Sequence, residues 1–237
     1  IVGSAMLFGH VVDAGAYSTD MAELSLCAWV GGVPHSPGYP LWVRLAEAAL
    51  FVQGGADPIH ALGRLSAVFA VLTALLTRSI LRSFGVGVWA SSAAALLLLV
   101  VPLFVRSFSI PEVHALDLFL LSLAIWCAQK GSVNTKGPWI ALAWATVIIA
   151  IGHRPVNVIL LMTIAFGFRH IQDRPKSVLG GLAIGVGIQG VLYADLWARI
   201  RDPATPWIDE HAATSPDAFF GFILGLPFEK FLSFSLI

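Results

Sequence analysis

Long apolar blocks, each about 15 to 22 residues, recur along this chain and constrain its fold more than any other feature. Such blocks exceed the length of a buried strand and approach the roughly 20 residues that a helix needs to cross a bilayer. Only 12% of the 237 residues are charged, against roughly a quarter in ordinary globular proteins. Because a lipid-facing backbone must satisfy its hydrogen bonds internally, we predict an all-α, polytopic bundle of transmembrane helices.

The charge balance and the cysteine count exclude several classes of protein. Fourteen Lys and Arg residues balance fourteen Asp and Glu residues, so no basic nucleic-acid-binding surface is expected. Cys27 and Cys127 lie in apolar contexts and are interpreted as small buried residues rather than as a disulfide or a metal pair. The chain has no Walker loop, dinucleotide fingerprint, CxxC pair or GxSxG elbow, and its histidine spacing predicts no zinc site.

The apolar blocks divide the chain into membrane and loop regions of a single domain. We expect the end of a first membrane helix at residues 1–9, an outer loop at 10–58, six membrane helices within 59–197, an outer loop at 198–218 and the start of a further helix at 219–237. The six blocks lie near residues 59–81, 86–105, 113–128, 138–152, 155–168 and 177–197. Because the chain opens without a Met or a basic region and closes within an apolar run, we expect a fragment truncated at both ends.

A shorter apolar block at residues 41–52 carries Arg44 and Glu47, which predicts an interfacial juxtamembrane helix in the first outer loop. With this block outside the membrane, the charged turns separate into two classes. One class holds a single acid, Asp173, and seven bases: Arg78, Arg82, Lys130, Lys136, Arg169, Arg174 and Lys176. The other class holds eleven acids and five bases. By the positive-inside rule, the acidic turns face the periplasm or a lumen, as in a multi-pass protein of a bacterial inner membrane or the ER membrane.

Histidines and carboxylates from four separate loops converge on this predicted outer face, and these are the usual groups of general acid–base catalysis. Asp20 and Glu23, spaced i and i+3, share one face of a predicted helix start and could address one substrate or one cation; helix capping explains the same spacing. His35 lies in residues 31–40, where three prolines and three glycines predict an irregular, rigid loop. His35 is therefore a candidate hydrogen-bond donor to a phosphate, or a candidate proton carrier, with a plain interfacial turn as the alternative.

Two further loops supply candidate residues. Glu112 and His114 precede an apolar helix with Asp117 in about its first turn, so they could orient a substrate, or an acid could simply complement the helix dipole. His153 and Arg154 form a basic pair between two apolar blocks. A guanidinium offers a planar fork of donors that suits a phosphate, whereas snorkelling of an arginine to the surface is the alternative.

At these residues the sequence resembles the protein O-mannosyltransferase-like membrane proteins of the GT-C glycosyltransferase superfamily. The family pattern has Asp-x-Gly-Glu, then His-Pro-Pro-Gly-Tyr-Pro-Leu, then Glu-Val-Tyr-x-Leu. This chain has DMAE at residues 20–23, HSPGYPL at 35–41 and EVHAL at 112–116, in the same order. Residues 201–209 and the FFGF stretch at 219–222 also resemble the family's Trp-containing loop and the Phe-rich segment after it. Ala22, Ser36 and His114 replace the family's Gly, first Pro and Tyr.

The resemblance implies an inverting transfer of a sugar, mannose or another hexose, from a polyprenyl-phosphate carrier to an acceptor hydroxyl. It implies a lipid-linked donor, a protein or glycan acceptor, a surrounding of membrane lipids, and no nucleotide or metal cofactor. Asp20 resembles the family's catalytic base, with Glu23 beside it. The residues expected to bind substrate are His35, Tyr39, Glu112, His114, His153, Arg154 and Trp207.

Two other classes of protein remain as alternatives. A secondary transporter or lipid flippase would also be helical, but it should carry polar residues at mid-membrane and paired broken helices. The apolar blocks here are nearly free of ionisable groups, which favours chemistry at one surface. A purely structural membrane subunit leaves the HSPGYPL segment and the acids before it unexplained.

Overall fold

A computed structural model describes residues 19–54, 57–134, 137–159, 164, 174–209 and 214–225 of the chain. Within these ranges the structure is helical, and an isolated parallel bridge joins Val33 to Ile208. The elements in chain order are α2 (Thr19–Val30), α3 (Pro40–Val52), α4 (Pro58–Ser83), α5 (Val88–Val100), α6 (Pro102–Ser109), α7 (His114–Asn134), α8 (Gly137–His153), the 3-10 turn η1 (Pro155–Asn157), α10 (Pro175–Arg201) and α11 (Pro216–Ile223).

Three of the helices, α4, α7 and α10, are long and apolar enough to cross a membrane. Helices α5 and α8 are also apolar but shorter, with 13 and 17 residues. The predicted all-α membrane fold is therefore confirmed. Four of the six expected blocks correspond to α4, α7, α8 and α10, and α3 occupies the block predicted to be interfacial.

One expected helix differs from the structure, and two others lie partly outside the described residues. The block at residues 86–105 is two helices, because Pro102 lacks a backbone N–H to continue α5 and instead opens α6. Of the block at residues 155–168, η1 is described and most of the remainder lies outside the described residues. The described part of the expected run at residues 219–237 begins within α11, which ends before Gly225, where φ is +76°. Residues 1–9 and 226–237 lie outside the described ranges.

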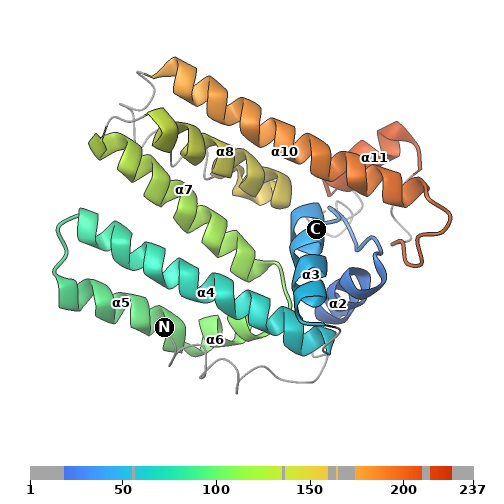
Figure 1. The fold of residues 1–237 in the computed structure, drawn as a ribbon, viewed down its shortest axis with the longest axis horizontal. Helices are drawn as coiled ribbons and strands as arrows, with labels where there is room; N and C mark the ends of the chain where they lie inside the picture. Colours follow the sequence, from blue (N-terminus) through green and yellow to red (C-terminus); the bar gives the residue numbers. More distant parts are fainter. Residues whose placement is uncertain are drawn as a thin grey trace, which may run out of the picture.

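The long helices lie side by side, with α8 between α10 and α7, and α7 between α8 and α4 (Figure 1). Helix α5 flanks α4, while α2 and α3 pack at one end of this layer, with α3 crossing the ends of the long helices (Figure 1). Helices α8 and α10 approach closely at Gly181, where an added Cβ would lie 2.2 Å from the Ala141 carbonyl oxygen. A small residue is required there, as at many helix contacts in membranes.

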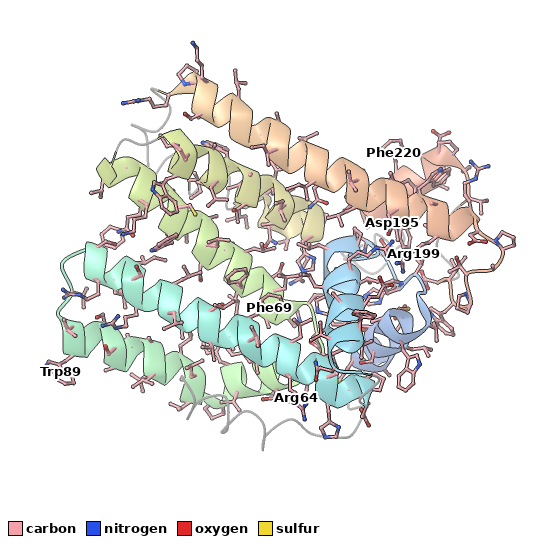
Figure 2. The ribbon with its side chains drawn as sticks, in the orientation of Figure 1. Arg64, Phe69, Trp89, Asp195, Arg199 and Phe220 are labelled. Carbon is pink, nitrogen blue, oxygen red and sulfur yellow. The ribbon has the colours of Figure 1, made fainter. Side chains whose placement is uncertain are left out.

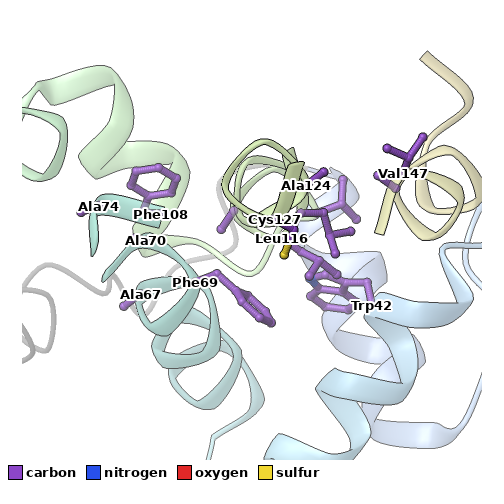
Figure 3. Packing of buried hydrophobic residues seen from close by; sticks show 14 of the residues in the cluster. Trp42, Ala67, Phe69, Ala70, Ala74, Phe108, Leu116, Ala124, Cys127 and Val147 are labelled. Carbon is purple, nitrogen blue, oxygen red and sulfur yellow. The ribbon is translucent and has the colours of Figure 1, made fainter. Parts of the chain in front are cut away.

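The main apolar core joins α3 to the bundle. Trp42 of α3 is fully buried and packs in one cluster with Phe69 of α4, Leu116 of α7 and Val147 of α8 (Figure 3). Burying an aromatic side chain of this size removes a large apolar area from water and dominates local packing energy. The core therefore fixes the start of α3, and with it the loop that precedes α3.

The described acids and the bases of the predicted basic turns lie toward opposite ends of the bundle, as predicted. The turn between α4 and α5 and the start of α10 lie at the end opposite α2 and α3 (Figure 1). The described bases of the predicted basic turns lie toward that end: Arg78, Arg82, Lys130, Arg174 and Lys176. The described acids lie toward the end with α2 and α3: Asp20, Glu23, Glu47, Asp57, Glu112, Asp117, Asp195, Asp202, Asp209 and Asp217. Lys136, Arg169 and Asp173 lie outside the described residues.

Candidate functional site

The loop at residues 31–39, between α2 and α3, is held in place by distant segments of the chain. The Val33 N–H donates to the Trp207 carbonyl at 2.8 Å, and the Asp209 N–H donates to the Val33 carbonyl at 3.1 Å. On the other side, the Ser36 hydroxyl donates to the Phe222 carbonyl of α11. The loop is therefore a fixed platform between α2, α10 and α11, as its proline and glycine content predicts.

Gly38 and Tyr39 set the direction in which the loop enters α3. Both have positive φ, at +81° and +40°, and α3 begins at the next residue, Pro40. Glycine adopts this backbone region without steric cost. An added Cβ at Gly38 would also lie 2.8 Å from Leu196 and 3.0 Å from Phe222. The backbone thus needs Gly38 both for its conformation and for contact with α10 and α11.

Glu23 of α2 and His35 of the loop form a tight pair. The backbone N–H of His35 donates to one Glu23 carboxylate oxygen at 2.6 Å, and the ring nitrogen Nδ1 of His35 lies 2.8 Å from the other oxygen. Both side chains are mostly buried. Burial alone would lower the pKa of His35, but the hydrogen bond and the charge of Glu23, with smaller contributions from Asp20 and Asp209, raise that pKa above 6.5. The pair is therefore a carboxylate-oriented imidazole with an increased affinity for a proton.

Tyr39 connects this pair to the end of α8. Its ring centroid lies 5.4 Å from that of His35 and 5.8 Å from that of His153, and both contacts are edge-to-face. Burial raises the pKa of Tyr39 to about 12. The Tyr39 hydroxyl therefore stays protonated and can donate a hydrogen bond.

The buried carboxylate of Asp117, in the first turn of α7, contacts residues at and just after the end of α8. Asp117 Oδ2 accepts a hydrogen bond from Arg154 Nη1 at 2.7 Å, and Asp117 Oδ1 accepts one from Asn157 Nδ2 at 2.9 Å. His153 is fully buried, with Nε2 3.7 Å from Asp117 Oδ1. The Val113 backbone also interacts with this imidazole, outside hydrogen-bond geometry. Asp117 is thus the centre of this half of the site.

His114 and Glu112 extend the site to the surface. Arg154 Nη1 lies 3.3 Å from His114 Nδ1, and His114 Nε2 lies 3.3 Å from a Glu112 carboxylate oxygen. The contacts form one continuous series, named here the polar chain: Glu23, His35, Tyr39, His153, Asp117, Arg154, His114 and Glu112. Seven of these eight residues were expected to be functional from the sequence, and the structure brings those seven together.

Asp20 and Trp207, the other two expected site residues, lie at the margins of the polar chain. Asp20 is exposed one helical turn before Glu23, and its charge contributes to raising the pKa of both His35 and Tyr39. No hydrogen bond involves its carboxylate within the described ranges. Trp207 holds the loop through its backbone, and the residue is 42% exposed.

Asp117 and Asn157 were not among the site residues predicted from the sequence. Asp117 had a detectable signal, because an ionisable residue in an apolar membrane helix is costly and usually has a partner. Asn157 had none, because its position under Asp117 depends on how η1 turns after α8. Its Nδ2 also donates to the Ala150 carbonyl at 2.9 Å, which ties the carboxylate to α8.

A second polar group, named here the α3–α10 ion-pair cluster, joins two helices at the same end of the molecule. Glu47 accepts hydrogen bonds from Arg199 at 2.6 and 2.9 Å and from Arg44 at 2.7 Å. Asp195 pairs with Arg44 and lies 3.3 Å from Arg199 Nε. Asp195 and Arg199 of α10 lie where this helix meets α3 (Figure 2). The cluster fixes the end of α10 against α3, beside the loop.

Comparison with known proteins identifies the family. Neither the curated proteins nor the solved structures gave a match. A family model described as "Protein O-mannosyl-transferase TMEM260 N-terminal domain" matches residues 20–177, which span α2 to the start of α10 and include the whole polar chain. Because the match covers more than half of the chain, the protein belongs to this protein O-mannosyltransferase family.

Proposed function

We propose that this glycosyltransferase moves a hexose, mannose or another, from a polyprenyl-phosphate carrier to a hydroxyl of a protein or glycan acceptor, with inversion, at the periplasmic or lumenal face of its membrane. One observation carries the proposal. The polar chain joins the mostly buried Glu23–His35 pair, one helical turn from the exposed Asp20 of α2, to a guanidinium and imidazole region at α7 and α8, on the acidic end of the bundle. These are the groups that proton removal and phosphate departure require.

Arg154 is the proposed contact for the departing phosphate. Asp117 holds its Nη1, while Nε and Nη2 make no hydrogen bond within the described part of the chain, and the side chain is 33% exposed. Those N–H groups can donate to phosphate oxygens as negative charge develops on them. His114 and His35 are proposed to donate to the same phosphate or to the sugar. Contact of His153 with substrate stays a prediction, since the ring lies beneath the surface here.

Asp20 is the proposed base. As the acceptor oxygen bonds to the anomeric carbon, the bond from that carbon to the phosphate oxygen breaks, the phosphate keeps the electron pair, and the hydroxyl proton passes to Asp20. Glu23 assists by holding His35, and Glu112 is proposed to bind sugar hydroxyls beside His114. Tyr39 and Trp207 are proposed to contact the sugar or the acceptor.

The test uses sealed vesicles that contain the full protein and a radiolabelled polyprenyl-phosphate hexose. The proposal predicts transfer of label to an acceptor peptide or glycan, with no nucleotide sugar added. Arg154→Ala should raise the donor KM more than the acceptor KM. Label that crosses the membrane while still attached to its carrier would instead indicate a flippase, and an unchanged donor KM in Arg154→Ala would remove the phosphate role of this residue.

A further inference from the structure

The carboxylate of Asp117 is buried at the start of α7 and contacts three groups of the α8–η1 segment. Its side chain is only 7% exposed. Arg154 Nη1 and Asn157 Nδ2 donate to its two oxygens, at 2.7 and 2.9 Å, and His153 Nε2 lies 3.7 Å from Oδ1. A buried carboxylate is costly unless it is paired and hydrogen-bonded, so this arrangement needs all its partners.

Asn157 fixes the direction in which the carboxylate points. Its Nδ2 donates to both Asp117 Oδ1 and the Ala150 carbonyl, each at 2.9 Å. Its backbone N–H donates to the Arg154 carbonyl, also at 2.9 Å, and closes the turn that carries Arg154. The acid, the amide and the arginine are therefore held in one rigid unit across α7, α8 and η1.

This unit holds the Arg154 side chain in one orientation but does not use all of its hydrogen-bond donors. One guanidinium nitrogen is committed to Asp117, while Nε and Nη2 remain without hydrogen bonds among the described residues and the side chain reaches the surface. A free arginine side chain loses rotamer entropy when it binds an anion, and prior fixation of its planar fork reduces that loss. We infer that Asp117 is a positioning residue, supported by Asn157, that holds Arg154 ready for the phosphate of the lipid-linked donor.

The inference rests on the proposed phosphate role of Arg154, and a double-mutant cycle separates the two. The full protein in detergent is titrated with a polyprenyl phosphate that carries no sugar. Because each change removes or misplaces a charged hydrogen bond, we expect Arg154→Ala and Asp117→Asn each to weaken binding about 10-fold. The double variant should bind no more weakly than Arg154→Ala alone, since Asp117 acts only through Arg154. Thr146→Val, which removes a buried hydroxyl of α8 bonded to Leu142, is the matched control and should bind as the wild type does.

Transfer kinetics supply a second measurement. Asp117→Asn should raise the donor KM while the acceptor KM stays unchanged, whereas a purely structural role would lower the amount of folded protein and leave both constants alone. Methylguanidine should restore binding to Arg154→Ala but not to the double variant, because the added cation needs the Asp117 carboxylate to hold it.

The outcomes are distinguishable. Weak binding by Arg154→Ala with wild-type binding by Asp117→Asn would overturn the positioning role and leave the proposed function intact, as would additive losses in the double variant. Wild-type binding by Arg154→Ala would overturn both. Should Asp117→Asn fail to fold, Asn157→Ala takes its place, with an expected loss of about 3-fold from freeing the carboxylate; unchanged binding by that variant would also overturn the inference.

Discussion

The α3–α10 ion-pair cluster and the polar chain lie at the same end of the molecule but satisfy their charges differently. In the cluster, two acids and two arginines pair with one another: Glu47 and Asp195 each contact both Arg44 and Arg199. In the polar chain and at its margin, the described residues offer no hydrogen bond to Asp20 or to Nε and Nη2 of Arg154. Neither ring nitrogen of His153 has a partner in hydrogen-bond geometry among them.

The difference separates a group that supports the fold from one that is available for chemistry. Mutually satisfied charges hold two helices together and have little left to offer a ligand. Incompletely satisfied polar groups cost stability, and proteins keep them mainly at functional sites. We therefore expect changes in the cluster to affect stability first, and changes in the polar chain to affect activity first.

The largest stability effect is expected at Gly38, which links the two regions through α10 and Tyr39. Gly38→Ala adds both backbone strain at φ +81° and an overlap with Leu196, for an expected loss of about 2–4 kcal/mol. Gly31→Ala is the matched control, because Gly31 also has positive φ (+73°) but no atom lies within 4 Å of its Cβ position. Thermal unfolding in detergent should show a much smaller loss for Gly31→Ala, and equal losses would contradict the packing role of Gly38.

A smaller effect is expected from opening the ion-pair cluster. Glu47→Gln leaves Arg199, which is 15% exposed, with a weakened partner, so we expect a loss of about 1–3 kcal/mol, below the roughly 3–5 kcal/mol of fully buried pairs. Transfer per folded molecule should stay near that of the wild type. Asp202→Asn, at an exposed acid beyond the end of α10, is the control and should change neither quantity. A loss of donor affinity in Glu47→Gln would show that the cluster belongs to the site.

The smallest effect is a pH dependence that comes from His35. Because Glu23 raises the pKa of His35 in the folded protein, this pair contributes stability that is fully present below pH 6.5 and is lost as pH rises through the raised value. The melting temperature measured from pH 6 upward should fall across that window in the wild type. Glu23→Gln should flatten this dependence, and an unchanged profile in that variant would contradict the pairing.

Much of the fold could be predicted from hydrophobic periodicity and loop composition. Helices α4, α7, α8 and α10 follow apolar blocks of suitable length, and charge patterning assigned α3 to the interface. The break at Pro102 could have been predicted, because proline cannot continue a helix from the preceding turn. However, the residues around Pro102 are so apolar that the block at residues 86–105 was predicted to be one membrane helix.

Residues of the candidate site could be predicted where residue type alone singles them out. Contacts that depend on how distant segments pack together could not be predicted. His35, Glu23 and Arg154 stood out as polar groups between apolar blocks. By contrast, the Arg44–Asp195 pair joins residues 151 positions apart, and the bridge from Val33 to Ile208 joins two loops that are distant in the sequence. Such contacts depend on how α10 packs against the rest of the protein, which the local sequence does not predict.

Asp20→Asn and Glu47→Gln, compared in the polyprenyl-phosphate hexose transfer assay, test whether the polar chain and the ion-pair cluster have different roles. Both variants replace one carboxylate by an amide at the same end of the molecule, one at the site and one in the ion-pair cluster. Asp20→Asn should lose at least about 100-fold in transfer rate, the usual scale of a missing general base, at an unchanged melting temperature. Glu47→Gln should melt earlier and keep its rate per folded molecule. Retained transfer by Asp20→Asn, or an equal loss of rate in folded Glu47→Gln, would contradict the division of roles between the two regions.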